Sequence, residues 1–279
     1  MSALPGTPFF LEHCPRPLFI IRYDASPDAV FRGDVLHLPA FGEEMNKSRA
    51  IVALQARTLA QMGYRVLVPD YSGTGDSAGE FGETSWEHWL EDMRCCLAYL
   101  QAQGAGPVTL WGLRLGALMG VELASDARLE ISRLLLWNPV LQGELFMQQF
   151  LRLRLASSMM SGDGKEKVSD LKQRLSDEGI LEVAGYELSA AMFNEVCARK
   201  ARDMVLPANL EVFWADVALA VKPLPAPAQS LVDSWQEGGL TVGIEQIQAS
   251  PFWATQEIAR ADELVKKTTA WLGAQLQHG

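Results

Sequence analysis

The segment LWGLRLGA, Leu110–Ala117, decides the fold class of this 279-residue chain. It joins an apolar run to a helical pattern through Gly112 and Gly116, which stand two positions either side of Arg114. A sharp strand-to-helix turn needs small residues at this spacing, because its tip is strained and the strand and helix pass close together. Ala117 keeps the following position small as well. The segment therefore predicts an elbow between a buried strand and a helix, with a guanidinium at its tip.

The segments around this elbow alternate between strand-like and helix-like patterns. Tyr64–Pro69 and Ile131–Trp137 are nearly continuous apolar runs, which suit strands buried on both faces of a sheet. Between them, Thr84 and Glu87 have the spacing of a capping box at the start of a helix. The helix itself is indicated by an apolar stripe: Trp86, Trp89, Leu90, Met93, Leu97 and Leu100. Strands alternating with helices predict an α/β fold, with a mostly parallel sheet covered on both faces.

The alternation lapses between Leu141 and Asp203, where the sequence turns helical and carries several methionines. An insertion of this kind over an α/β sheet predicts a helical lid. The pattern resumes with strands at 210–214 and 240–244, which a proline-rich connector joins. We expect one domain in three consecutive parts, namely a first part of the core, the lid and a second part of the core, at 1–140, 141–205 and 206–279.

Composition and charge exclude several classes of partner. The 24 basic and 34 acidic residues give a formal charge of −10, which repels nucleic acid and acidic membrane surfaces. The first residues lack the pattern of a signal peptide, and no apolar run reaches the roughly 18 residues that span a bilayer. The four cysteines show no CxxC pattern, and neighbouring Cys95 and Cys96 are badly placed to bridge one another. We predict reduced cysteines and a cytoplasmic protein, and leave the oligomeric state open.

Two further motifs lie before the elbow. HLPAFGEEMNKSR, His37–Arg49, leads from an early strand into a helix, and DYSGTGDS, Asp70–Ser77, follows a buried strand. Asp70 and Asp76 cluster with hydroxyl groups in the second motif, but their spacing is not that of an EF-hand. We therefore predict no metal and no cofactor.

These pieces together resemble the α/β-hydrolase superfamily, and more closely the second type of exosortase A system-associated hydrolase. The resemblance is carried by four motifs: P-x-F-x-E-E-M-N-K-S-R at Pro39–Arg49, G-x-G-D-S with its aromatic helix at Gly73–Trp89, W-G-L-R-x-G at Trp111–Gly116 and P-F-W at Pro251–Trp253. It runs over most of the chain. It implies the α/β-hydrolase fold, a lid after the sixth strand, and a setting in bacteria that make exopolysaccharide and sort envelope proteins.

A serine hydrolase of this fold needs a nucleophile at the elbow, an acid after a later strand and a histidine near the end. Here Arg114 occupies the elbow, Asp216 fills the acid position and Pro251 stands where the superfamily usually has histidine. A guanidinium is neither nucleophile nor base near neutral pH. None of the chain's histidines fits the required order: His13, His37, His88 and His278. Ordinary Ser-His-Asp catalysis is therefore not expected.

A cation at the start of a helix meets the positive end of the helix dipole, at a cost of about 0.3 to 1 kcal/mol unless an anion compensates. The sequence predicts that this anion is Glu43, Glu44, Asp216 or a bound ligand. His37 is either a general acid or base or a satisfied structural histidine. Residues expected to line a substrate pocket are Phe41, Asp76, Ser77, Trp86, Trp111, Leu113, Leu115, Phe252 and Trp253.

Three functions stay open at this point. The first is hydrolysis of an ester, thioester or acylated saccharide by water, with Glu43, Glu44 or Asp216 as the base and Arg114 stabilising the developing charge. The second is a non-catalytic protein that binds an anionic acyl or sugar ligand at Arg114. The third is a structural or partner-binding protein in which an ion pair at Arg114 fills the former active site.

Overall fold

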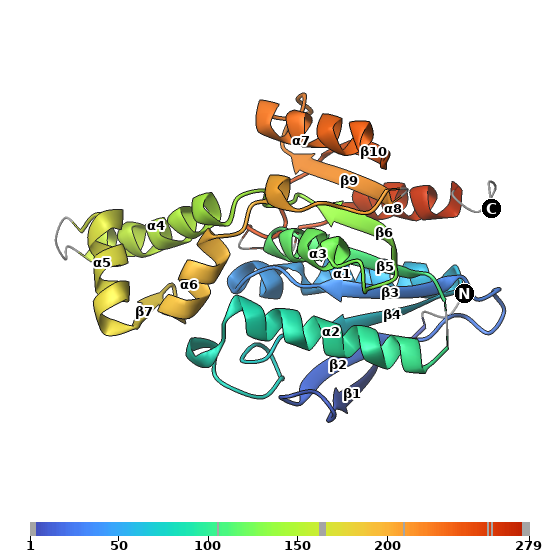
Figure 1. The fold of residues 1–279 in the computed structure, drawn as a ribbon, viewed down its shortest axis with the longest axis horizontal. Coiled ribbons are helices and arrows are strands. Elements are labelled where there is room, and N and C mark those ends of the chain that lie inside the picture. Colours follow the sequence, from blue (N-terminus) through green and yellow to red (C-terminus); the bar gives the residue numbers. More distant parts are fainter. Residues whose placement is uncertain are drawn as a thin grey trace.

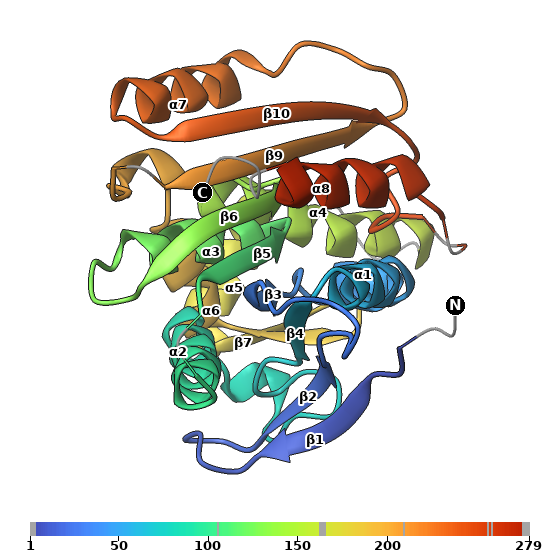
Figure 2. The same ribbon diagram turned by 90° about the vertical axis from the view of Figure 1, so that its right-hand side faces the viewer.

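The computed structural model describes residues 4–104, 106–161, 166–208, 210–255, 257 and 259–274. Its centre is an eight-stranded sheet in the order β1-β2-β4-β3-β5-β6-β9-β10 (Figures 1 and 2). Only β2 runs antiparallel to its neighbours, so the predicted α/β fold with a mostly parallel sheet is confirmed. The strands are β1 (Thr7–Leu11), β2 (Leu18–Tyr23), β3 (Gly33–Leu38), β4 (Tyr64–Pro69), β5 (Val108–Leu113), β6 (Ile131–Trp137), β9 (Glu211–Ala218) and β10 (Thr241–Gln248).

Helices cover both faces of this sheet (Figure 2). On one face lie α1 (Glu43–Gln61) and α8 (Asp262–Ala274). On the other face lie α2 (Trp86–Ala102), α3 (Leu115–Ser125) and α7 (Ala226–Glu237). Side chains alternate along each strand. In β3, therefore, Leu36 and Leu38 pack toward α2 and α3, whereas Val35 and His37 face the α1 side.

An insertion between β6 and β9 lies beyond the carboxyl ends of the parallel strands (Figure 1). It contains more than the predicted helices, because a β-hairpin turns at Ala184 and Gly185, which both have positive φ. Such φ values are what a two-residue hairpin turn requires. The elements are α4 (Gly143–Ser161), α5 (Val168–Glu178), β7 (Ile180–Val183), β8 (Tyr186–Ser189), α6 (Ala190–Cys197) and the 3-10 turn η2 (Ala201–Asp203).

Two local predictions were wrong. The proline-rich connector contains helix α7, because Pro225 caps its start and Pro227 falls in its first turn, where a missing N–H is tolerated. Helix α2 is capped by Ser85, whose Oγ accepts a hydrogen bond from the backbone N–H of His88 at 3.3 Å. The Thr84 hydroxyl donates instead to the carbonyl of Phe81.

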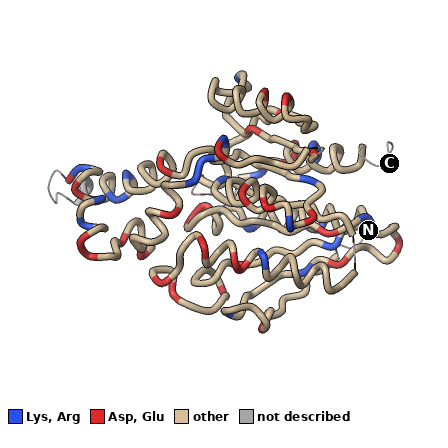
Figure 3. The backbone as a smooth tube through the Cα atoms, viewed as in Figure 1, with Lys and Arg blue, Asp and Glu red and all other residues tan. Residues whose placement is uncertain are grey.

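The cysteines also differ from the prediction. Cys14 and Cys95 form a disulfide that ties the segment after β1 to α2 across 81 residues of sequence, so they are not reduced. Cys96 and Cys197 are free thiols. Within the described ranges, no helix is both long and apolar enough to cross a membrane. Basic residues are interspersed with acidic ones over the core and the insertion (Figure 3).

Candidate active site

The predicted elbow is present between β5 and α3. A Cβ atom at Gly116 would overlap the carbonyl oxygens of Leu38 and Pro39, and one at Gly112 would overlap the backbone of Ala117. Arg114, at the tip, has φ 57° and ψ −115°, a conformation that side-chain-bearing residues rarely adopt. The backbone of the tip therefore depends on glycines at both flanking positions.

The Arg114 side chain makes three contacts around this tip. Its Nε donates a hydrogen bond to Oε1 of Glu44 at 3.2 Å, and its Nη1 approaches the carbonyl oxygen of Asn138 at 3.4 Å. The ring of Trp253 lies 5.3 Å from the guanidinium carbon, within the range of a cation–π interaction. The anion that compensates the cation at the start of α3 is therefore Glu44, rather than Glu43 or Asp216.

The Glu44 carboxyl is only partly satisfied. Its Oε2 is buried and has no hydrogen-bond partner among the described residues. Burial raises the pKa of Glu44 above its ordinary value, while the charge of Arg114 and its hydrogen bond act in the opposite direction. A carboxyl group with a raised pKa is better suited to accept a proton near neutral pH than an ordinary one.

A cavity of about 220 Å³ adjoins this ion pair. Arg114, Glu44, Glu43 and Phe41 line it on the core side. Helix α4 of the insertion covers the opposite side with Phe146, Gln149, Phe150 and Leu153. These four residues were not predicted from the sequence, although their i, i+3, i+4, i+7 spacing marks a single helical face. The cavity therefore has an ion pair on its core side and largely apolar side chains on the side of α4.

Glu43 takes part in a different contact at the start of α1. Its Oε2 accepts hydrogen bonds from Tyr186 Oη and from Asn46 Nδ2, each at 3.2 Å. Tyr186 belongs to β8, so this contact ties α1 to the insertion. Burial, together with the neighbouring Glu43 charge, raises the pKa of Tyr186 to about 12. Tyr186 was also missed, because no local pattern connects residues 143 positions apart.

Near the carboxyl terminus, the structure brings one predicted residue to Arg114 and leaves another apart. The Trp253 ring contacts the guanidinium, while Phe252 is buried and packs against the rings of Trp137 and Trp253. Asp216 lies within β9 rather than after it, and burial raises its pKa. In the part of the chain that the structure covers, its carboxyl group makes no hydrogen bond or ion pair.

Other predicted pocket residues have structural contacts. Ser77 Oγ donates to the carbonyl of Asp70 and accepts from the N–H of Phe19, which fixes the loop after β4. Asp76 is exposed in the same loop. Trp86 and Trp111 are fully buried in the core on opposite faces of the sheet.

The remaining predicted residues flank the elbow or lie elsewhere. Leu115 is buried in the core at the start of α3, on the face that α2 and α3 cover. Leu113 and His37 both line a different cavity, on the α1 side of the sheet. His278 lies outside the described residues.

The comparisons with known proteins agree with this architecture. Residues 32–177, slightly more than half of the chain, match the family described as serine aminopeptidase, S33. The chain belongs to this family. No curated protein matches the sequence.

Solved structures of α/β hydrolases share the fold. Est1E from Butyrivibrio proteoclasticus, with ferulic acid bound, is 16% identical with a TM-score of 0.64, over 96% of this chain and 99% of its own. An α/β serine hydrolase without a lid from Xanthomonas campestris is 17% identical with a TM-score of 0.54, over 99% and 96%. A lipase/esterase from Lactobacillus plantarum is 15% identical with a TM-score of 0.57, over 99% and 98%. At these identities the likeness concerns the fold alone.

Proposed function

We propose that this S33-family protein hydrolyses an ester or thioester of a small neutral acyl compound, by a mechanism without a serine nucleophile. The observation that carries the proposal is the Glu44 carboxyl. It is paired with Arg114 at the elbow, has a buried unpartnered oxygen and a raised pKa, and borders a cavity under α4. Perturbed carboxyl groups in such settings are candidates for acid–base catalysis.

In the proposed reaction, Glu44 accepts a proton from a water molecule while the water oxygen bonds to the acyl carbon. Arg114 and the N–H groups of Leu115 and Gly116 stabilise the resulting oxyanion, because the first amides of a helix have no partner within it; the next amide, that of Ala117, already donates to the Arg114 carbonyl. The C–O or C–S bond then breaks, and Glu44 returns the proton to the departing alkoxide or thiolate. The products are a carboxylic acid and an alcohol or thiol.

The charges of the cavity favour a neutral substrate. Two carboxylates, Glu43 and Glu44, line it together with a single guanidinium, Arg114. An anionic ligand would compete with Glu44 for Arg114 and would be repelled by both carboxylates. We therefore favour a neutral acyl ester over the anionic ligand that Arg114 alone suggests. The aromatic rings of Phe41, Phe146 and Phe150 suit an acyl chain or a sugar ring.

The insertion and the biological setting belong to the same proposal. We propose that residues 141–205 act as a lid, which the position of α4 over the cavity supports. The resemblance of Pro39–Arg49 and Trp111–Gly116 to exosortase A system-associated hydrolases supports an acylated saccharide as the substrate.

A cytoplasmic location stays a prediction. The Cys14–Cys95 disulfide weighs against it, because such bonds are rare in cytosolic proteins. The test is to alkylate the free thiols immediately on cell lysis and to count the alkylated cysteines per chain by mass spectrometry. Four alkylated cysteines support the cytoplasm, whereas two contradict it.

The proposed reaction is tested with a panel of aryl esters, acyl thioesters and acetylated sugars. We expect activity above a heat-inactivated control, and a loss of at least about 10²-fold in kcat for Glu44→Gln. Glu43→Gln is the matched control, because Glu43 is adjacent on α1 but its described partners are Tyr186 and Asn46. Equal rates for Glu44→Gln and the wild type, or no activity with any substrate, would reject the proposal.

The second candidate is a non-catalytic protein that binds an acyl ligand in the same cavity. It is favoured because, among the described residues, no serine or histidine side chain is hydrogen-bonded to Arg114. Esters that the wild type binds without hydrolysing, and that the Phe150→Trp variant no longer binds, would support this candidate. The third reading, an ion pair that fills the former active site, is disfavoured by the cavity beside Arg114.

A further inference from the structure

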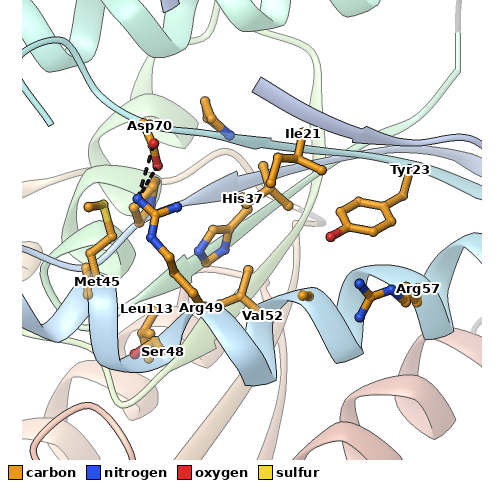
Figure 4. A pocket seen from close by; sticks show the side chains of 15 residues that line it. Ile21, Tyr23, His37, Met45, Ser48, Arg49, Val52, Arg57, Asp70 and Leu113 are labelled. Carbon is orange, nitrogen blue, oxygen red and sulfur yellow. Dashed lines mark hydrogen bonds and ion pairs between the residues drawn. The ribbon is translucent and has the colours of Figure 1, made fainter. Parts of the chain in front are cut away.

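A second cavity of about 220 Å³ lies between α1 and the sheet (Figure 4). It is separate from the cavity under α4, because α1 borders each through different residues: Glu43 and Glu44 there, Met45 and Val52 here. Its walls are largely apolar and come from β2, β4, β5 and α1: Ile21, Val68, Leu113, Met45, Val52 and Ala53. The proposed hydrolysis does not use this space.

His37 places an unpaired acceptor beside these apolar walls, whose other polar lining residues are Tyr23, Ser48, Arg49, Arg57 and Asp70. The residue is 3% exposed, and its Nδ1 lies 3.0 Å from the carbonyl oxygen of Trp111. A carbonyl can only accept, so Nδ1 carries the proton. Burial lowers the pKa of His37 to about 3, which keeps the ring neutral and leaves Nε2 with a free lone pair. Among the described residues, Nε2 has no hydrogen-bond partner, and the ring projects toward α1 into the cavity (Figure 4).

An acceptor of this kind selects the ligand's polar group. A carboxylate has no proton to donate to Nε2, so it would leave this buried acceptor unpaired. A protonated amine can donate, but the lining is net positive: Asp70 is paired with Arg49 at 3.0 Å, and the second guanidinium, Arg57, has no carboxylate partner among the lining residues. A neutral hydroxyl group remains, because it donates to Nε2 without bringing a charge.

The cavity's size and walls limit the rest of the ligand. Its volume is below the roughly 300 to 1,000 Å³ of pockets for drug-sized molecules, which suits a single ring or a short chain. The Tyr23 ring and the Met45 thioether both make favourable contacts with aromatic rings. We propose that this cavity binds a small neutral phenol, whose hydroxyl group donates a hydrogen bond to Nε2 of His37. The proposal does not depend on the hydrolytic function.

The test compares 4-ethylphenol with 4-ethyltoluene, which has a methyl group in place of the hydroxyl, and with 4-ethylbenzoate, which is an anion. Calorimetric titration of the full chain should show 4-ethylphenol binding on the order of tenfold more tightly than 4-ethyltoluene, the effect of one hydrogen bond. The benzoate should not bind. Equal affinities for the phenol and the toluene, preferential binding of the benzoate, or no binding of the phenol would overturn the proposal.

Variants assign the binding to this cavity. Ala53→Phe fills it and should abolish phenol binding, whereas Ala50→Phe, at an exposed position of the same helix, should leave the affinity unchanged. His37→Phe should bring the two affinities to within about twofold, because it removes the acceptor and keeps a ring. Phenol binding that survives in Ala53→Phe would overturn the assignment.

A measurement on the wild type covers the case in which His37→Phe does not fold. The ¹⁵N resonance of His37 Nε2 should shift when the phenol is added and stay in place when the toluene is added. If the chemical shift of this resonance does not change when the phenol is added, the phenol hydroxyl group is not hydrogen-bonded to His37.

Discussion

The elbow's backbone and the pocket above it are held in very different ways. The backbone is fixed by close packing, because Gly112 and Gly116 have main-chain atoms where a side chain would begin. The pocket is assembled from Phe41, the start of α1, the elbow and α4, and its polar contacts centre on the Arg114–Glu44 ion pair. In this chain, therefore, the backbone geometry of the tip is set by packing that does not involve the Arg114 side chain.

The largest expected effect comes from disrupting the close backbone packing of the elbow. Gly116→Ala should destabilise the protein by more than about 4 kcal/mol or prevent folding, because the new Cβ overlaps two backbone carbonyl groups that cannot move aside. Urea denaturation measures the change. Gly120→Ala in the same helix is the control, since its Cβ meets only side-chain methyl groups, those of Leu38 at 3.0 Å and Leu134 at 3.9 Å, and it should stay within about 1 kcal/mol of the wild type. A Gly116→Ala protein as stable as the wild type would contradict the packing argument.

An intermediate effect separates the Arg114 backbone from its side chain. Arg114→Gly should be more stable than Arg114→Ala by about 1 to 2 kcal/mol, because both lose the Glu44 pair and only glycine relieves the positive φ. Thermal or urea unfolding of the two variants gives the difference. The same pair of substitutions at Glu122, inside α3, should show the opposite order, since glycine weakens an ordinary helix. Equal stabilities at position 114 would show that the tip carries no strain.

The smallest effect concerns the ion pair and depends on pH. Burial raises the pKa of Glu44 in the folded protein, so its protonated form adds stability that is fully present below its ordinary pKa of about 4.5. That contribution is lost as the pH rises through the raised value. The free energy of unfolding of the wild type, minus that of Glu44→Gln, should therefore fall as the pH rises above 4.5, by less than the effect at Arg114. Glu43→Gln is the control: the difference in free energy of unfolding between the wild type and this variant measures the effect of removing a carboxylate from the same end of α1. If the difference in free energy of unfolding between the wild type and Glu44→Gln rises with pH instead, the pKa of Glu44 is lowered on folding, and the prediction is wrong.

The sequence predicted the fold where one type of pattern dominates. Tyr64–Pro69 and Ile131–Trp137 are strands with the predicted bounds, because continuous apolar runs suit only buried strands at that length. Helix α7 was missed because prolines that merely begin a helix look like a connector. The β7–β8 hairpin was missed because its turn, Ala184-Gly185, is short and lies in a helical context.

For the site, the sequence limited the candidate residues but could not predict which residues distant in the sequence contact one another. It identified Arg114 as a cation in need of an anion, yet left Glu43, Glu44 and Asp216 as equal candidates. Choosing among them depends on how α1 is rotated over the elbow, which tertiary packing sets. Trp86 and Trp111 were placed in the pocket as aromatic residues expected at strand ends and loops, whereas the inward faces of α2 and β5 bury them.

Helix α1 is a wall shared by two cavities, so we expect occupancy of one to be felt at the other. Glu44 faces the ion pair at the elbow, and Met45, one residue later, faces the chamber that contains His37. A ligand that displaces α1 from either side alters the opposite cavity. Thermodynamic linkage then requires the influence to be mutual, so that each ligand changes the affinity for the other by the same factor.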